Sequence, residues 1–147
     1  MARRRIEVDV SAEHFFNVMV DYEKYPEFLP EFVEAEIIGE SSEGRRVRFV
    51  RRFASISMRF TLDFLEEPYR RLSWKAAQSD KFDLLQGSCE IETLSPETLF
   101  IHLDLETRLK GPFPKFLCTK VAELGMPTML GNFKRRAEYL AGLPVPG

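Results

Sequence analysis

The most constraining feature of the sequence is a series of short segments in which apolar and polar residues alternate. The clearest segment is Ile56–Phe64, where every second residue is apolar. This period of two places the apolar side chains on one face of a β-strand. The same pattern recurs in Arg5–Val10, Val33–Ile37, Val47–Phe49, Leu72–Ala76, Leu85–Ile91 and Leu99–Leu105. Because turn residues separate most of these segments by a few positions, we expect a seven-stranded antiparallel meander.

Two regions have helical patterns instead. Ser11 is a suitable N-cap for a short helix that carries Phe15, Val18 and Met19 on one side. The next segment contains Pro26 and Pro30, which limit it to a turn or two of helix. We therefore expect two short helices after the first strand.

The second helical region follows Pro114 and ends near Gly142. It has two apolar stripes that lie nearly opposite each other at about 100° per residue. The first stripe is Leu117, Val121 and Leu124, and the second is Met126, Leu130, Phe133, Ala137 and Leu140. The change falls at Gly125–Pro127, and a proline in a helix interior removes a donor and clashes with the preceding turn. We predict a long C-terminal helix with a bend or interruption within residues 124–128.

Charged residues are segregated along the chain. From Glu23 to Glu43 there are seven Glu and one Lys, whereas Arg45–Phe60 has six Arg and no acid. The arginine block is compatible with a nucleic-acid patch. Folding a hairpin about Ser42 favours a simpler explanation, because Ile37 then faces Val47 and Glu36 faces Arg48. We expect Glu34 and Glu36 to pair with Arg46 and Arg48 on a solvated sheet face.

Length and composition exclude several classes of protein. The 147 residues fit one domain over 1–147, and 44% hydrophobic residues exclude a disordered chain. No apolar run reaches the roughly 20 residues of a membrane span. The N-terminal residues alternate rather than form the apolar core of a signal peptide. Two cysteines favour the cytoplasm, and the net charge of −2 gives no general attraction to DNA.

Three motifs resemble those of a known family. They are Asp21–Pro30, which contains Tyr25-Pro26-Glu27-Phe28-Leu29-Pro30, the spacing of Phe82, Leu85 and Gly87, and the segment Asn132–Glu138. Together they resemble the polyketide cyclase/dehydrase and lipid-transport family of the START/Bet v 1-like superfamily. The closest branch holds the coenzyme Q-binding proteins and a ribosome-association toxin. The resemblance implies an α+β helix-grip fold, in which the curved sheet wraps around the C-terminal helix. Ser88, where relatives often have an aromatic residue, and Pro127 depart from the family pattern.

Few residues suggest chemistry. His14 and His102 form no metal motif, and His102 has the strand parity of solvent-facing acids. Cys89 has the parity of inward-facing residues, and Cys118 is interpreted in the same way, as a small hydrophobic residue. Arg51 either points inward with a partner or is turned outward by a bulge, and we favour the bulge. We expect no catalytic residues, no cofactor and no metal.

The remaining candidates are apolar and would line a cavity between sheet and helix, which the family resemblance implies. They are Phe28, Leu29, Met58, Phe60, Leu62, Trp74, Ile91, Leu103, Leu117, Val121, Met126, Met129, Leu130 and Phe133. We expect non-enzymatic binding or transport of a hydrophobic small molecule of the polyprenyl quinone, lipid or polyketide type. One alternative is a ribosome- or protein-interaction module that uses Arg45–Arg59, and another is a polyketide cyclase or aromatase. A membrane surface and the ribosome are further partners that this interpretation leaves open.

Overall fold

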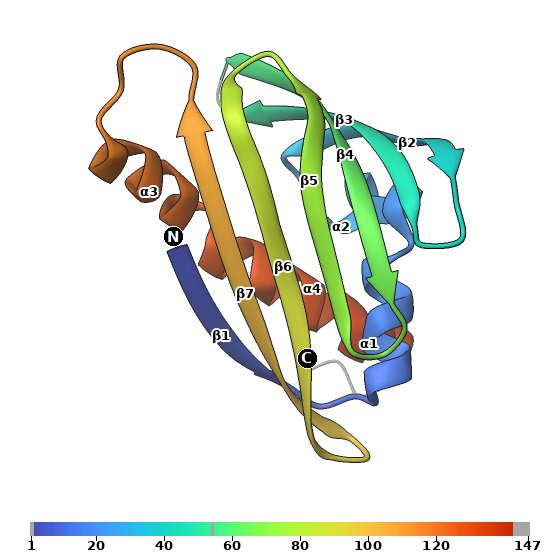
Figure 1. The fold of residues 1–147 in the computed structure, drawn as a ribbon. Coiled ribbons are helices and arrows are strands. Elements are labelled where there is room, and N and C mark those ends of the chain that lie inside the picture. Colours follow the sequence, from blue (N-terminus) through green and yellow to red (C-terminus); the bar gives the residue numbers. More distant parts are fainter. Residues whose placement is uncertain (1, 54, 143–147) are drawn as a thin grey trace.

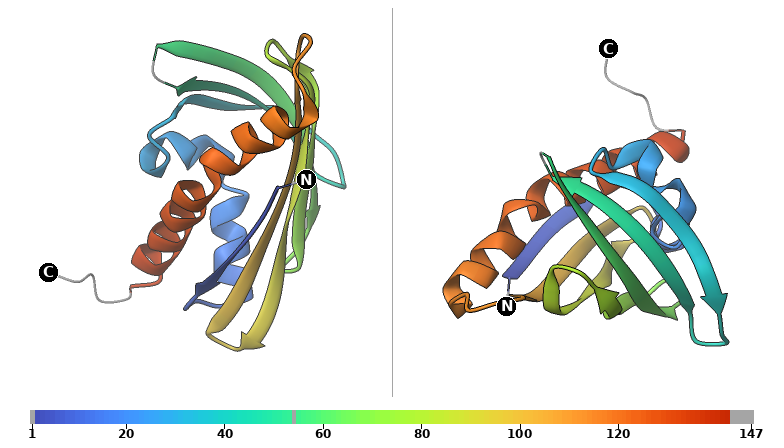
Figure 2. Two further views of the ribbon diagram at one scale, coloured as in Figure 1. Left: turned by 90° about the vertical axis from the view of Figure 1, so that its left-hand side faces the viewer. Right: turned by 90° about the horizontal axis from the view of Figure 1, so that it is seen from above.

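The fold is built on one curved antiparallel sheet with helices on its concave face (Figures 1 and 2). A computed structural model describes residues 2–53 and 55–142, apart from the side chains of Phe53 and Val121. Within these ranges the seven strands are β1 (Ala2–Val8), β2 (Phe32–Glu40), β3 (Arg45–Phe53), β4 (Ile56–Glu67), β5 (Arg71–Ser79), β6 (Phe82–Ser95) and β7 (Thr98–Leu109). The helical segments are α1 (Ala12–Met19), the 3₁₀ turn η1 (Tyr22–Lys24), α2 (Tyr25–Phe28), α3 (Lys115–Leu124) and α4 (Met126–Leu140). The predicted α+β helix-grip architecture is confirmed.

The strand order is β1-β7-β6-β5-β4-β3-β2, so β2 to β7 form the predicted meander. The first strand does not join its neighbour in sequence. It pairs with β7 at the other edge, with Ala2 opposite Leu105 and Val8 opposite Leu99. Because its pairing with β7 extends to Ala2, β1 begins at Ala2 and not at Arg5 as predicted. Val10 is buried but lies beyond the strand, in the turn that leads to α1.

The connection between the two edge strands supplies α1, η1 and α2. The Ser11 side chain accepts a hydrogen bond from the His14 backbone N–H at 3.1 Å, as expected for an N-cap. Helix α1 buries Phe15, Val18 and Met19, together with Phe16, against the sheet side. The short helices after β1 are thus confirmed, and they cross the concave face of the sheet.

The C-terminal helix is interrupted as predicted, because α3 ends at Leu124 and α4 begins at Met126. Pro127 is the second residue of α4, a position at which the missing N–H is not needed for an intrahelical hydrogen bond. In α4 the predicted stripe is largely correct, since Met126, Leu130 and Ala137 are buried. The α3 stripe is wrong. The buried residues there are Cys118 and Ala122, each one position after Leu117 and Val121 in the sequence.

The charge blocks pair across strands, but only partly as predicted. Glu36 faces Arg48, and their side chains form an ion pair of 2.6 Å. Arg46 instead pairs with Asp63 of β4, with Nε 2.6 Å from Oδ1. The expected partnership of Glu34 and Arg46 is wrong, because the hairpin register sets Glu34 opposite Val50.

The space between sheet and helices has two different ends. Near α1 and the C-terminal half of α4 it is a packed core. Val8, Leu99, Ile101 and Ala137 have no exposed surface there. Near the β3–β4 turn and the α3–α4 junction the same space is incompletely filled, and this end holds the candidate site.

Candidate functional site

An apolar cavity of about 380 Å³ lies between the concave face of the sheet and helices α3 and α4. It is within the size range of small-molecule sites, about 300–1,000 Å³. The predicted residues that line it are Leu29, Met58, Phe60, Leu62, Trp74, Leu103, Met126, Met129, Leu130 and Phe133. The wall thus combines side chains from strands β4, β5 and β7 and from helix α4, which are distant from one another in the sequence.

Three predicted residues lie elsewhere among the described residues. Phe28 packs edge-to-face on Phe133, with ring centroids 5.1 Å apart, and therefore stands behind the wall. Ile91 belongs to the packed end of the core, opposite Ile101 in the sheet. Leu117 is only half-buried, because α3 turns Cys118 toward the sheet. The Val121 side chain lies outside the described residues.

Other lining residues were not predicted. Phe49, Phe64 and Leu85 follow the inward parity of their strands, so the strand pattern contained the signal for them. Tyr25 and Phe32 also line the cavity, although they come from the irregular connection after α1. No periodicity marks these two, since their position depends on how the connection crosses the sheet.

Aromatic rings form one wall of the cavity. Tyr25 stacks on Phe49, with centroids 5.8 Å apart and ring planes 18° apart. Phe49 also packs against Phe60 at 5.6 Å, and Phe32 contacts both Phe49 and Tyr25 edge-on. Such ring pairs stabilise beyond the area that they bury. This wall is therefore a mutually supported surface rather than a set of independent side chains.

Polar groups in the wall are few, and most already have partners. The Tyr25 hydroxyl donates a hydrogen bond to the Met19 carbonyl, and burial raises the pKa of Tyr25 well above its usual range. Burial also raises the pKa of the Cys89 thiol to about 12. Its sulfur is therefore protonated at neutral pH, as in structural buried cysteines.

Arg51 stands at the edge of the cavity, which corrects our preference for an outward-turned side chain. It lines the cavity, its side chain is 22% exposed, and its guanidinium pairs with Glu31, Nε lying 2.9 Å from Oε2. Arg51 also lies over the Phe32 ring at 5.5 Å. A Cβ at Gly125 would be 3.1 Å from its Nη2, so the guanidinium reaches the α3–α4 junction. This arginine has the partner that its burial requires.

The cavity reaches the surface beside Arg51. Two of its lining residues are strongly exposed: Ile56 at the start of β4 is 56% exposed, and Leu124 at the end of α3 is 66% exposed. Residues that both line a cavity and face solvent mark its mouth. We use "mouth" below for the opening between Ile56 and Leu124.

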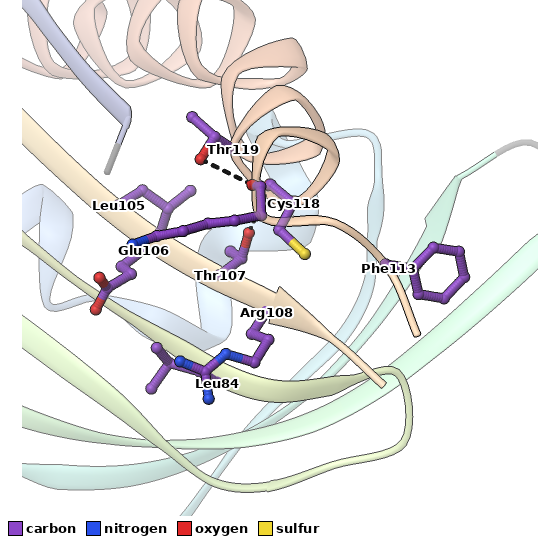
Figure 3. A pocket seen from close by; sticks show the side chains of 9 residues that line it. Leu84, Leu105, Glu106, Thr107, Arg108, Phe113, Cys118 and Thr119 are labelled. Carbon is purple, nitrogen blue, oxygen red and sulfur yellow. Dashed lines mark hydrogen bonds between the residues drawn. The ribbon is translucent and has the colours of Figure 1, made fainter. Parts of the chain in front are cut away.

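A second, smaller pocket of about 170 Å³ lies outside this cavity, between β7 and the start of α3 (Figure 3). Its wall includes the charged residues Glu106, Arg108 and Lys115. Nearby, Thr107 donates a hydrogen bond to the Cys118 carbonyl at 2.9 Å, and the Leu109 N–H points to the Cys118 sulfur at 3.4 Å. These contacts fix α3 to the end of β7.

The two histidines have structural positions. His14 Nε2 donates to the Ala137 carbonyl at 2.8 Å and so links α1 to α4. His102 Nε2 lies 2.8 Å from Glu92 on the outer side of the sheet. Neither residue lines the cavity. Within residues 2–53 and 55–142, no three His, Cys, Asp or Glu side chains gather as a metal site would require.

Comparisons with known proteins agree with this geometry. A sequence model described as "Polyketide cyclase / dehydrase and lipid transport" matches residues 8–134. The chain belongs to this family. It is 28% identical over 131 residues to the ribosome association toxin RatA of Pseudomonas aeruginosa, covering 89% of this chain and 90% of the toxin. The family match confirms the resemblance that the Tyr25–Pro30 motif indicates.

Solved structures show the same fold for this family member. A START superfamily protein from Mycobacterium smegmatis has a TM-score of 0.86 at 23% identity, over 95% of this chain and 97% of that one. The ZhuI aromatase/cyclase from Streptomyces sp. R1128 has a TM-score of 0.76 at 18% identity, over 93% and 92% of the two chains. In the described part of this family member, no helix is long and apolar enough to cross a membrane.

Proposed function

We propose that this protein binds a hydrophobic small molecule non-covalently in the cavity between the sheet and α3–α4. The observation that carries the proposal is the cavity itself. It has about 380 Å³ of space, walls that are almost wholly apolar, and an opening at Ile56 and Leu124. Apolar clefts with a few placed polar groups are the usual form of ligand sites. The family description, which includes lipid transport, supports the same class of ligand.

The ligand class is a polyprenyl quinone, a lipid or a polyketide, held and then delivered. Burying roughly 300 Å² of apolar ligand surface contributes about 7 kcal/mol at ~25 cal/mol/Å². Loss of ligand freedom offsets much of this, so we expect micromolar affinity. Met58, Met126 and Met129 give the wall adaptable side chains, which suits ligands of variable shape. Both described cysteines are free, as is usual in the cytoplasm, where we place this function.

Binding is favoured over catalysis by the state of the polar groups in the wall. The Tyr25 hydroxyl is engaged by Met19, the Cys89 thiol is protonated, and Arg51 is paired with Glu31. A cyclase needs groups in the cavity that exchange protons near neutral pH. The fold likeness to the ZhuI aromatase/cyclase therefore supports the shape of the site more than its chemistry.

A second candidate function is ribosome association, which the likeness to RatA favours. Its footprint would be the arginine block Arg45–Arg59. Arg45 pairs with Glu66, Arg46 with Asp63 and Arg48 with Glu36, so much of this charge is already compensated within the sheet. Loss of salt-sensitive ribosome co-sedimentation on reversing Arg46 and Arg48, with the fold intact, would replace ligand binding as the preferred function.

A thermal-shift screen with quinones, fatty acids and polycyclic aromatic compounds tests ligand binding directly. A ligand that binds only the folded state raises the melting temperature. Phe60→Trp, inside the cavity, should weaken that shift at least several-fold while leaving the unliganded protein about as stable. Leu65→Trp is the matched control, because Leu65 is on the same strand and faces solvent. If no apolar compound gives a shift, or if Phe60→Trp costs the ~1–3 kcal/mol of an overpacked core, the proposal fails.

A further inference from the structure

Exposed apolar side chains lie at the mouth of the cavity and also on α3 and the loop before it. Phe116 on the outer side of α3 is 76% exposed, and Phe113 in the loop before it is 48% exposed. Leu124 and Ile56, which define the mouth, are also exposed. Single exposed apolar residues are common, but several at the end of the molecule where an apolar cavity opens indicate a surface that meets a partner. We call these four residues the mouth surface.

The segment that carries Phe113 and Phe116 is also basic. Residues 107–122 contain Arg108, Lys110, Lys115 and Lys120 and no acidic residue. All four side chains are exposed. None of them forms an ion pair with another described residue, in contrast to the compensated arginines of β3. This segment therefore presents uncompensated positive charge next to aromatic rings.

The geometry keeps these features on one end of the molecule. Figures 1 and 2 show the loop after β7, α3 and the start of β4 at the same end of the sheet, while the β4–β5 and β6–β7 turns lie at the opposite end. The hydrogen bonds from β7 to Cys118 fix α3 in this place. The mouth surface is thus a built feature of the folded chain.

We propose that the mouth surface and the lysines beside it dock onto an anionic phospholipid membrane. Phe113 and Phe116 would enter the interface between head groups and acyl chains, and Lys110, Lys115 and Lys120 would contact the acidic head groups. The mouth between Ile56 and Leu124 then faces the acyl region. This docking rests on the proposed function, because it supplies the route by which an apolar ligand enters and leaves.

The energetics of transfer favour a membrane over RNA as the partner. An apolar ligand that left the cavity into water would lose the stabilisation of its whole buried surface. A lipid surface at the mouth removes that cost, because the ligand passes from one apolar environment to another. Phe113 and Phe116 have rings that a base can stack on, but Leu124 and Ile56 offer a nucleic acid neither a hydrogen bond nor a flat ring, and both suit contact with acyl chains.

Vesicle co-sedimentation tests the docking surface. The purified chain is mixed with vesicles of phosphatidylcholine alone or with about one third phosphatidylglycerol. We expect binding to the anionic vesicles that falls as salt is raised. Phe113→Ser/Phe116→Ser and Lys115→Glu/Lys120→Glu should each weaken it by about 30-fold, as expected for two lost contacts of the usual size.

Matched controls lie at exposed positions away from the mouth. Leu94→Ser/Tyr139→Ser removes apolar residues of similar exposure, and Arg70→Glu/Arg71→Glu reverses two exposed charges at the β4–β5 turn. Both control variants should bind vesicles as the unmodified chain does. Equal losses in controls and mouth variants would overturn the proposal, as would binding to RNA or ribosomes without binding to anionic vesicles.

A separate readout distinguishes failure of docking from failure of the cavity. Binding of the water-soluble fluorescent probe anilinonaphthalene sulfonate is measured without vesicles and competed with an apolar compound from the thermal-shift screen. The mouth variants should keep this competition, which shows an intact cavity. Competition without vesicle binding overturns the docking proposal alone. Vesicle binding that depends on the mouth surface, without competition, supports docking and overturns the proposed ligand site.

Discussion

The indole of Trp74 lies across Gly87 on the neighbouring strand β6. The two residues face each other in the register of β5 and β6. A Cβ at position 87 would be 2.7 Å from Trp74 Cζ2 and 2.6 Å from the Asp104 carbonyl oxygen. Glycine is therefore required here for close approach, and it lets a large ring rest against the sheet. Because Trp74 lines the cavity, this contact sets part of the cavity wall.

Gly87→Ala should consequently destabilise the fold and alter ligand binding. The new methyl group meets backbone on one side, so the indole must move, and overpacking of this kind costs about 1–3 kcal/mol. Urea denaturation and the thermal-shift response to ligand measure the two effects. Gly39→Ala in β2 is the control, because its Cβ would meet only Arg46 Cβ at 3.5 Å. Equal behaviour of the two variants would contradict the close contact.

Pro127→Ala tests the interruption of the C-terminal helix. A proline inside a continuous helix costs roughly 3 kcal/mol, so its removal would stabilise such a helix strongly. At the second position of α4 the cost is absent, and we expect a change below about 1 kcal/mol in the free energy of unfolding. Arg135→Pro, at an exposed position inside α4, should cost the full amount. A large gain in stability from Pro127→Ala would indicate a continuous helix.

The Arg46–Asp63 pair predicts a pH-dependent contribution to stability. Hydrogen bonds from Arg46 hold the pKa of Asp63 below its usual range. The folded state thus favours the carboxylate. Its contribution is present above the unfolded pKa, near 3.9, and is lost as pH falls through the lower folded value.

Asp63→Asn should therefore lower the urea midpoint at pH 7, and the gap to the unmodified protein should close as the solution becomes strongly acidic. Glu34→Gln is the control. Glu34 is exposed and has no ion-pair partner among the described residues. Glu34→Gln should therefore change the urea midpoint only slightly, and this change should not depend on pH in the same way. A gap for Asp63→Asn that stays constant from pH 7 to strong acid would disprove the pairing.

Cys89 should react very slowly with alkylating reagents in the folded protein. With a pKa of about 12, its thiolate is roughly a thousand-fold rarer at pH 8 than that of a free cysteine. The rate is measured with iodoacetamide and mass spectrometry in a Cys118→Ala background, which leaves Cys89 as the single thiol. In guanidinium the ordinary rate should return. Ordinary reactivity in the folded state would show that solvent reaches the cavity wall at this residue.

Periodicity predicted much of the fold because both types of element bury one face. The parity of Ile56–Phe64 places Met58, Phe60 and Leu62 in the cavity wall, and the α4 stripe places Met126, Leu130 and Phe133 opposite them. The interruption at Gly125 was also visible, since a proline cannot continue the preceding stripe. These features depend on the local geometry of a strand or helix, and the spacing of apolar residues and prolines in a single sequence is enough to predict them.

The predictions failed where contacts between distant segments determine how a helix is rotated or which side chains pair. The rotation of α3 depends on the hydrogen bonds between β7 and Cys118, and no local pattern predicts those bonds. Arg46 on β3 forms its ion pair with Asp63 on β4 and not with a glutamate on β2, although both neighbouring strands carry acidic residues. Arg51 reaches the cavity edge because Glu31, in the connection before β2, lies close enough to pair with it. Each outcome requires knowing which segments meet.

The pairing of β1 with β7 has a consequence for how the chain becomes a folded protein. Ala2 must find Leu105, a contact that spans most of the chain, and consecutive strands β1 and β2 end at opposite edges of the sheet. Contacts of such high sequence separation are associated with slow folding. During synthesis β1 is therefore made before its partner β7 and cannot take its place in the sheet until β7 has been added. Until β1 pairs with β7, that edge of the sheet is unpaired, and unpaired strand edges make a folding intermediate prone to aggregate.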